Sequence, residues 1–236
     1  REITPHHAAI RFMEKTQLFR PGKVNPPRQP FPWLCPLFFM LILASSSPRR
    51  RDLLREAGYD FVIETVDVEE EDHAPDGVAA LVQANAHLKA EPVAKANPEE
   101  VVIGADTLVA LEGIPFGKPK SMEEAFSMLR ELAGKTHTVL TGVAVFHLAA
   151  SRTRMFFTET KVTFHQLSDA EIRAYHQDIE PLDKAGAYAA QDQGQRIIQK
   201  TEGSWTNVVG LPIEDLLPIL TDFGIPAPPS TGHPIK

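Results

Sequence analysis

The sequence has one cysteine, no long apolar run and no metal-binding histidine motif, and each absence excludes a class of protein. A single thiol, Cys35, can form neither an internal disulfide nor a zinc site built from several thiolates. The nine histidines do not occur in the H-E-x-x-H spacing of zinc proteases. No apolar stretch approaches the roughly 20 residues of a membrane-spanning helix. We therefore expect a cytoplasmic protein from a reducing compartment, with no membrane partner.

The chain also lacks an excess of basic residues, since 24 Lys and Arg stand against 31 Asp and Glu and the net charge is -7. The charge is unevenly spread: residues 1–39 hold six basic and two acidic side chains, and residues 40–236 hold 18 and 29. An acidic body repels a nucleic-acid backbone. We expect no nucleic-acid partner, and a small phosphate ligand in complex with a metal ion fits this charge distribution better.

Proline content divides the chain into three parts. Residues 1–39 contain seven prolines and no sustained periodicity, which predicts a disordered N-terminal extension. Met40 stands directly before the first strand pattern, so we place the folded domain at residues 40–224. Residues 225–236 contain four prolines and are expected to form a loose C-terminal tail.

Three arginines open the first predicted helix. An apolar strand over residues 41–44 leads to Ser47 as N-cap and Pro48 as first helical residue, and Arg49, Arg50 and Arg51 follow in the first turn. A helix N-terminus already carries partial positive charge, so cations there are unfavourable unless the site receives an anion. We favour an anion site because the arginine fork matches phosphate geometry; a solvated basic helix start is the alternative.

An aspartate interrupts the most apolar segment of the chain. Residues 101–111 read as a buried strand that breaks at Gly104 and continues as a second strand segment, with Asp106 in its middle. A buried carboxylate costs several kcal/mol unless it is paired, hydrogen-bonded or bound to a metal. We therefore favour a catalytic role for Asp106 over a carboxylate that caps a bend beside Gly104.

Other charged residues are weak evidence for a functional site when each is considered alone. Residues 64–72 hold six carboxylates, which is typical of a solvated acidic loop, although a metal site would need only one or two of them. Lys89 falls late in a helix predicted over residues 75–96, which Pro92 should kink or end. Lys118 precedes a proline that makes its backbone extended and so directs its side chain.

The rest of the chain alternates between strand and helix patterns. The predicted elements are helices after capping boxes at Ser121 and Ser168, paired strands over residues 136–147 and 154–167, a last hairpin of residues 196–200 and 205–209, and a final helix over residues 213–223. His137, at the start of one strand, is interpreted as a hydrogen-bonded structural histidine.

Taken in order, the motifs of this chain resemble those of the Maf family. The matching segments are 45–50 (SSSPRR), 69–70 (EE), 104–107 (GADT), 117–119 (GKP), 136–139 (THTV), 141–142 (TG), 183–188 (DKAGAY) with Gln191, and 209–212 (VGLP). Their order and spacing agree from Met40 to about Phe223, and such a series is far more specific than any single motif. The resemblance implies an α/β fold with an elongated mixed β-sheet flanked by helices, like that of the inosine triphosphatases.

The resemblance also implies a chemistry. Enzymes of this kind cleave nucleoside triphosphates between the α- and β-phosphates with a divalent metal, Mg²⁺ or Mn²⁺, and release a monophosphate and pyrophosphate. By position, the metal ligands are Glu70 and Asp106, and the catalytic residues are Asp106 as proton acceptor, Glu70 and Lys118. The substrate-binding residues are Ser45, Arg49, Arg50, Lys89, Thr107 and Gln191. A homodimer is a further expectation from the family.

Three positions bear on which nucleotide base the site would accept. Within the family, Arg49, Thr107 and Gln191 match the branch similar to dTTP/UTP pyrophosphatases, whereas the branch resembling 7-methyl-GTP pyrophosphatases has Trp, Gln and Glu there. The sequence departs from the family after Gln191, where Asp192 and Gln193 precede Gly194 in place of an immediate glycine. Two alternatives remain open: the same chemistry on a purine nucleotide such as 7-methyl-GTP, and a nucleotide-binding regulator of septum formation with little turnover.

Overall fold

The structure is a computed structural model that describes residues 39–73 and 75–228. The expected disordered extension therefore lies outside the described residues except for Phe39, and so does the chain beyond residue 228. No helix in the described ranges is both long and apolar enough to cross a membrane.

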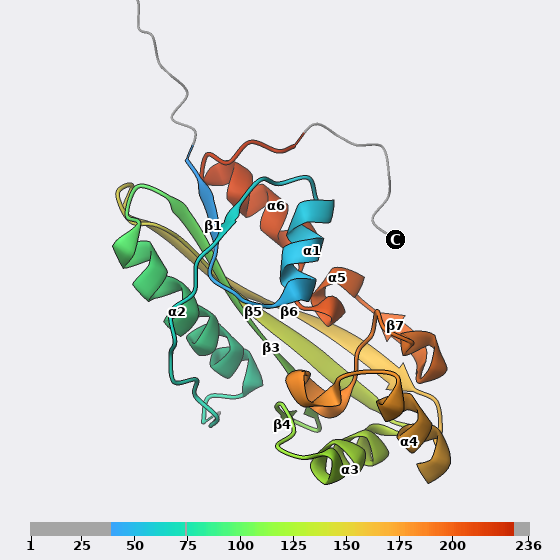
Figure 1. Ribbon diagram of the computed structural model, residues 1–236. Coiled ribbons are helices and arrows are strands. Elements are labelled where there is room, and N and C mark those ends of the chain that lie inside the picture. The colour runs from blue at the N-terminus through green and yellow to red at the C-terminus, as the bar shows by residue number, and fades with distance from the viewer. Residues whose placement is uncertain (1–38, 74, 229–236) are drawn as a thin grey trace, which may run out of the picture. The chain divides into compact units, whose positions relative to one another are not determined.

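The described chain is built around one seven-stranded mixed sheet (Figure 1). The strand order is β2-β1-β3-β5-β6-β7, with β4 paired to β3. β1 runs parallel to both of its neighbours, and the pairs from β3 to β7 are antiparallel. The strands are β1 (Leu41–Leu43), β2 (Val62–Ile63), β3 (Val101–Leu111), β4 (Ile114–Phe116), β5 (Thr136–His147), β6 (Arg152–Phe164) and β7 (Ile198–Glu202).

Helices flank this sheet, so the predicted mixed α/β class is confirmed. They are α1 (Pro48–Glu56), α2 (Val78–Ala96), α3 (Met122–Leu132), α4 (Asp169–Gln177), α5 (Trp205–Val209) and α6 (Ile213–Asp222), with single 3₁₀ turns at Pro181–Asp183, Ala185–Ala187 and Gly194–Arg196. The two predicted N-caps are confirmed, because Ser121 and Ser168 each accept a hydrogen bond from the backbone N–H of the glutamate three residues later.

The alternation of side chains along β1 explains the two layers of helices. Leu41 and Leu43 point to one face and pack in a buried cluster with residues of α1 and α6. Ile42 and Ala44 point to the other face and pack against α2. Figure 1 shows α2 on one side of the long strands and α1 with α6 on the other. All of β1 is buried, which is expected for a strand with helices on both faces.

Gly104 does not break the strand, contrary to the sequence prediction, because β3 is continuous from Val101 to Leu111. The glycine is needed for close packing instead. A Cβ at Gly104 would lie 2.5 Å from the carbonyl oxygen of Ala86, and one at Gly142 on β5 would lie 2.3 Å from that of Val82. The two glycines let α2 approach the sheet directly over the two central strands.

Helix α2 continues through Pro92 to Ala96, the predicted last residue, and buries Val93 and Ala94 beyond the proline. Two further expectations are corrected. Residues 205–209 form a helix and not the second strand of a hairpin, because Ser204 caps them by accepting from the N–H of Asn207. The tail is not loose at its first residue, since Ile225 is buried in the cluster of α1 and α6.

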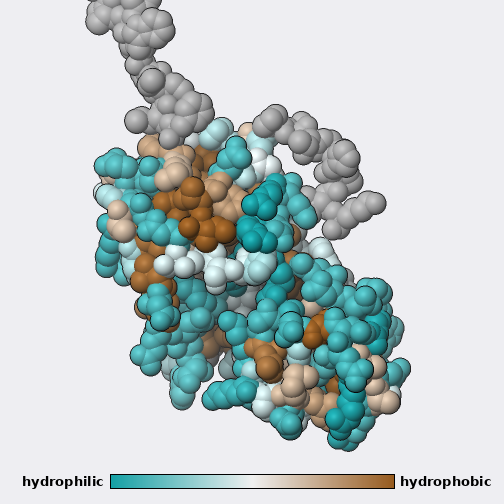
Figure 2. Space-filling model, in the orientation of Figure 1, coloured by the Kyte–Doolittle hydropathy of each residue, from teal (hydrophilic) through white to brown (hydrophobic). Residues whose placement is uncertain are grey.

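The surface is mostly hydrophilic, and the most extended apolar patch on the face drawn in Figure 2 lies in its upper part. Exposed apolar side chains there come from β2 and the loop that follows it, namely Val62, Ile63 and Val66. In Figure 1 this stretch of chain crosses β1 on its way to α2. The patch is small, and scattered exposed apolar residues are ordinary on protein surfaces.

His137 is a structural core histidine, as expected. Its side chain is 2% exposed, and its Nε2 lies 3.0 Å from the hydroxyl of Tyr188. Burial lowers the pKa of His137 from 6.5 to about 4. The imidazole is therefore neutral in the folded protein at physiological pH.

This burial makes stability depend on pH in mildly acidic solution. Between pH 6.5 and 4 the unfolded chain protonates residue 137 and the folded chain does not, so the free energy of unfolding falls as the pH falls. The contribution of His137 to this loss is about 3 kcal/mol. We expect the free energy of unfolding of His137→Gln, measured by urea titrations at pH 7, 5.5 and 4, to fall less with decreasing pH than that of the unsubstituted protein. The control is His165→Gln, since His165 is exposed. The same change of unfolding free energy with pH in all three proteins would contradict the prediction.

Candidate active site

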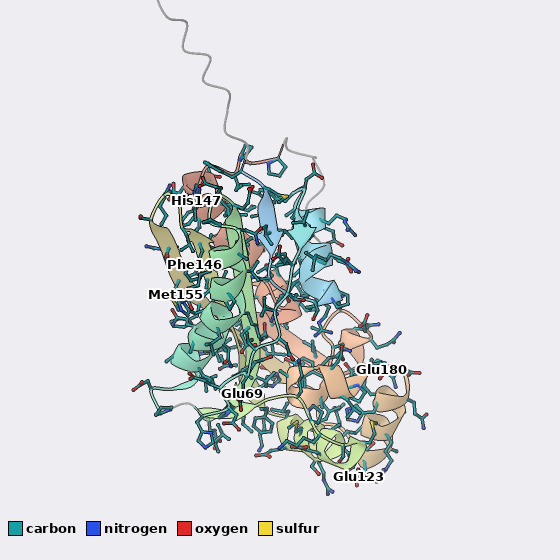
Figure 3. The ribbon with its side chains drawn as sticks, turned by 60° about the vertical axis from the view of Figure 1, so that its left-hand side comes forward. Glu69, Glu123, Phe146, His147, Met155 and Glu180 are labelled. Atoms are coloured by element: carbon teal, nitrogen blue, oxygen red, sulfur yellow. The ribbon has the colours of Figure 1, made fainter. Side chains whose placement is uncertain are left out.

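A cavity of about 480 Å³ opens beside the carboxyl end of β1. Its walls come from the turn into α1, the loop after β2, Lys89 of α2, the middle of β3, residues 183–191 and residues 208–210. Every site residue expected from the sequence lines it: Ser45, Arg49, Arg50, Glu70, Lys89, Asp106, Thr107, Lys118 and Gln191. In Figure 3, Glu69, the neighbour of Glu70, lies toward the lower end of the long strands, away from Phe146 and His147 at the upper end.

Arg50 is held at the centre of a polar network. Its Nε donates to the carbonyl oxygen of Gly210 at 2.8 Å, Nη1 to Ser45 Oγ at 3.1 Å and Nη2 to Thr107 Oγ1 at 3.0 Å. Burial lowers the pKa of Arg50, and the charge of Asp106 acts in the opposite direction. The planar guanidinium thus joins the turn before α1, strand β3 and the turn before α6, with two N–H groups left over for a ligand.

The network behind Arg50 continues into the core. Thr107 Oγ1 lies 3.0 Å from Thr141 Oγ1 on β5, and Thr141 donates to the carbonyl oxygen of Asn207 at 3.1 Å. Asn207 is fully buried and donates to Val139 and Thr160. The threonines therefore connect the arginine to two long strands and to α5, which fixes the position of the guanidinium.

Two other cations of the cavity, Arg49 and Lys118, are less constrained than Arg50. Arg49 lies 3.5 Å from Asp183, a carboxylate that is more than half exposed. Partial burial alone would raise the pKa of Asp183, but Lys184 and Arg49 hold it below its usual value. Lys118 is exposed at the cavity rim, on the segment between β4 and α3. Both Arg49 and Lys118 are thus available to an anion in the cavity.

Two carboxylates converge on one ammonium group on the acidic side. Lys89 Nζ lies 2.7 Å from Asp106 Oδ1 and 2.8 Å from Glu70 Oε2. Asp106 is buried with a residue exposure of 6%, and the Glu70 side chain is 44% exposed. The buried aspartate is therefore paired, as the cost of burying a charge requires.

The family model described as Maf-like protein matches residues 40–223 of this chain. The chain belongs to the Maf family.

Two curated proteins and one solved structure illustrate what the chain is similar to. A protein of Bacillus pumilus (strain SAFR-032), named dTTP/UTP pyrophosphatase, is 46% identical over 185 residues, which cover 78% of this chain and 97% of that protein. A protein of Pelotomaculum thermopropionicum with the same name is 47% identical over 186 residues, 78% of this chain and 96% of that protein. The solved structure of the Staphylococcus aureus Ham1 protein is 19% identical with a TM-score of 0.48, covering 78% of this chain and 99% of that chain.

This Maf chain has an unusual backbone directly after Gln191. Gln191 is exposed and lines the cavity, and residues 191–193 form a turn. Gln193 has a φ of 59°, a left-handed conformation that costs a non-glycine residue roughly 1 kcal/mol. The chain thus adopts, with Gln193, a conformation that glycine would take without strain.

One buried neighbour of Asp106 was missed by sequence reasoning. Asn85 on α2 is 2% exposed and its amide contacts both Asp106 and the acidic loop. Its position four residues before Lys89 places both side chains on one face of the helix. That spacing was the available signal, but a single asparagine in a helix pattern does not stand out.

Proposed function

We propose that this chain is a nucleoside triphosphate pyrophosphatase that hydrolyses dTTP and UTP between the α- and β-phosphates, and releases the monophosphate and pyrophosphate. The observation that supports it most is the convergence, in one cavity, of phosphate-binding cations with a paired, buried aspartate. The names of the similar proteins from B. pumilus and P. thermopropionicum support the substrate class.

The triphosphate binds on the basic side. Arg49, Arg50 and Lys118 line this side, and their charges offset those of the phosphates. Arg50 is held in place by three protein acceptors, so it loses little entropy when a phosphate oxygen binds. Positioning and charge stabilisation are what phosphoryl chemistry requires of a protein.

Glu70 and Asp106 would hold the divalent metal, Mg²⁺ or Mn²⁺. The site fits such an ion, because both carboxylates already approach a single cation, the Lys89 ammonium. Among the described residues no three side chains of His, Cys, Asp or Glu form a ligand cluster. Two carboxylates suffice for Mg²⁺, which usually completes its shell with water and substrate phosphates. Such an ion offsets phosphate charge and lowers the pKa of a bound water.

Asp106 is the general base. It lies on a continuous strand, and Lys89 Nζ holds one carboxylate oxygen, so the position of the group is fixed before substrate enters. The carboxylate accepts a proton from the attacking water as that water adds to phosphorus, and pyrophosphate leaves with the electron pair of the broken P–O bond. Lys89 stays close to neutralise the acidic side.

A nucleotide panel tests the proposal. The purified chain is mixed with each of the common ribo- and deoxyribonucleoside triphosphates and 7-methyl-GTP, with Mg²⁺ or Mn²⁺, and monophosphate and pyrophosphate are separated chromatographically. We expect dTTP and UTP to be the best substrates and the two products to form in equal amounts. Tight binding of dTTP without turnover, or release of single phosphate, would contradict the proposal.

Gln191 is the proposed selector of the base. Its amide offers a donor and an acceptor, which match the O4 and N3–H edge of uracil or thymine. We expect Gln191→Glu to lower kcat/KM for dTTP and UTP by about tenfold, since one good polar contact is worth about 1–3 kcal/mol. The same panel measures it, with Gln195→Glu as control. An unchanged ranking of nucleotides would remove Gln191 from this role.

Two earlier expectations stay predictions. We expect the activity in the cytoplasm, where nucleoside triphosphates are made. The homodimer is a prediction that sedimentation of the purified chain would test.

A further inference from the structure

The loop that carries Glu70 has few attachments to the rest of the fold. Residues 64–73 have no regular secondary structure. Within the described part of the chain, the bonds that join residues 65–73 to the rest of the fold come from two side chains of α2, Asn85 and Lys89. The position of the loop over the cavity therefore depends on one face of one helix.

The side chain of Asn85 binds the backbone of the loop. Its Oδ1 accepts from the N–H of Glu71 at 2.8 Å, and its Nδ2 donates to the carbonyl oxygen of the same residue at 3.0 Å. The amide therefore pairs with Glu71 as a neighbouring strand would. A longer contact of 3.4 Å joins Nδ2 to Asp106 Oδ2. One buried side chain thus spans the acidic loop and the buried aspartate.

The geometry of α2 combines this contact with the one made by Lys89. Residues four apart on a helix lie on one face, so Asn85 and Lys89 both point toward Asp106. Lys89 binds the Glu70 carboxylate, whereas Asn85 binds the backbone one residue further on. If a metal ion takes the place of the Lys89 ammonium at Glu70, the contact between Lys89 and the Glu70 carboxylate is lost. The contact between Asn85 and the Glu71 backbone remains.

We propose that Asn85 is a positioning residue that holds the Glu70 loop against Asp106, so that both carboxylates face one cation site before metal and nucleotide bind. The proposal rests on the proposed function for its consequence in catalysis. Its effect on the loop and on cation binding stands on the contacts of Asn85 alone. Residues that orient metal ligands in this way typically change metal affinity by about 10- to 100-fold when they are replaced.

The test uses Asn85→Leu, which keeps the branched shape of the side chain without its hydrogen-bonding groups, and Asn85→Ala, which leaves room for water. Glu71 is exposed, so its backbone groups can bind water in both variants and the fold has little to lose. We expect the amide hydrogen of Glu71 to exchange at least tenfold faster in metal-free protein, measured by NMR. Mn²⁺ affinity without nucleotide, measured by electron paramagnetic resonance, should fall about tenfold.

The matched control is Asn97→Ala at the other end of α2. Asn97 also binds the loop region, because its side chain donates to Glu64, the first residue of the loop. Neither Asn97 nor Glu64 lines the cavity. This variant should leave Glu71 exchange and Mn²⁺ affinity unchanged. With dTTP, the Asn85 variants should show a higher KM for the metal–nucleotide complex and a smaller change in kcat.

Unchanged Glu71 exchange in both Asn85 variants would overturn the proposal, whatever their activity. Equal Mn²⁺ affinity in Asn85→Leu and Asn97→Ala would also overturn it. If the unsubstituted protein releases no pyrophosphate from any nucleotide, the proposed function fails. The exchange measurement still decides the role of Asn85 in that case.

Discussion

We expect Asp106→Asn to lower kcat for dTTP by about a thousandfold while the protein stays folded. A positioned general base contributes roughly 10²- to 10⁴-fold, and the amide cannot accept the proton of the attacking water. The fold should persist because asparagine has the same shape as aspartate and its amide oxygen still accepts a hydrogen bond from Lys89. Lys89 also keeps its ion pair with Glu70. Pyrophosphate release with saturating Mg²⁺ measures the effect.

The control for Asp106→Asn is Asp60→Asn, which removes an exposed carboxylate outside the cavity. This variant should retain the activity of the unsubstituted protein. Circular dichroism and thermal unfolding of both variants verify that the domain is intact. Full pyrophosphate release by Asp106→Asn would disprove its role as base.

We expect Arg50→Lys to lower both stability and activity, although it conserves the charge. Lysine can reach at most part of the set formed by Gly210, Ser45 and Thr107, because it lacks the rigid fork of the guanidinium. Each hydrogen bond to a charged group is worth about 1.5–3 kcal/mol, so losing two of them costs about 3 kcal/mol of unfolding free energy. A cation displaced by about 1 Å also lowers kcat/KM by about a hundredfold.

Arg51→Lys is the matched control, because Arg51 belongs to the same helical turn and its side chain contacts Asp52 at the surface. Urea unfolding and dTTP kinetics on the two variants should separate them clearly. An Arg50→Lys protein as stable and active as Arg51→Lys would show that the network around Arg50 does not position it.

The residues that the sequence analysis selected all line one cavity, whereas several details of the backbone differ from the expectation. Arg50 and Asp106 were recognisable because each breaks a general rule: a cation at a helix N-terminus and a carboxylate within an apolar run. Such violations need a compensating partner, and the structure supplies it in Ser45, Thr107 and Lys89. The long strands and capped helices were equally predictable, because local periodicity and capping determine them.

The errors occurred where tertiary contacts override local pattern. Gly104 suggested a break, but the close approach of Ala86 on α2 requires it. The β-branched and aromatic residues after Ser204 suggested a strand, whereas the Ser204 cap and burial of Asn207 favour a helix. Asn85 was missed because its partner is the backbone of Glu71, which no side-chain motif reveals.

The contact between Arg50 and Gly210 has a consequence for synthesis of the protein. These residues lie 160 positions apart, and the carbonyl of Gly210 is among the last parts of the site to be made. A nascent chain that has reached only α4 already carries the arginines of the cavity, the Glu70 and Asp106 carboxylates, and Lys89 and Lys118. It still lacks the acceptor that orients Arg50 and the helix behind Thr141. The site is therefore completed only after α5 leaves the ribosome, and a product truncated before α5 keeps the charges without their arrangement.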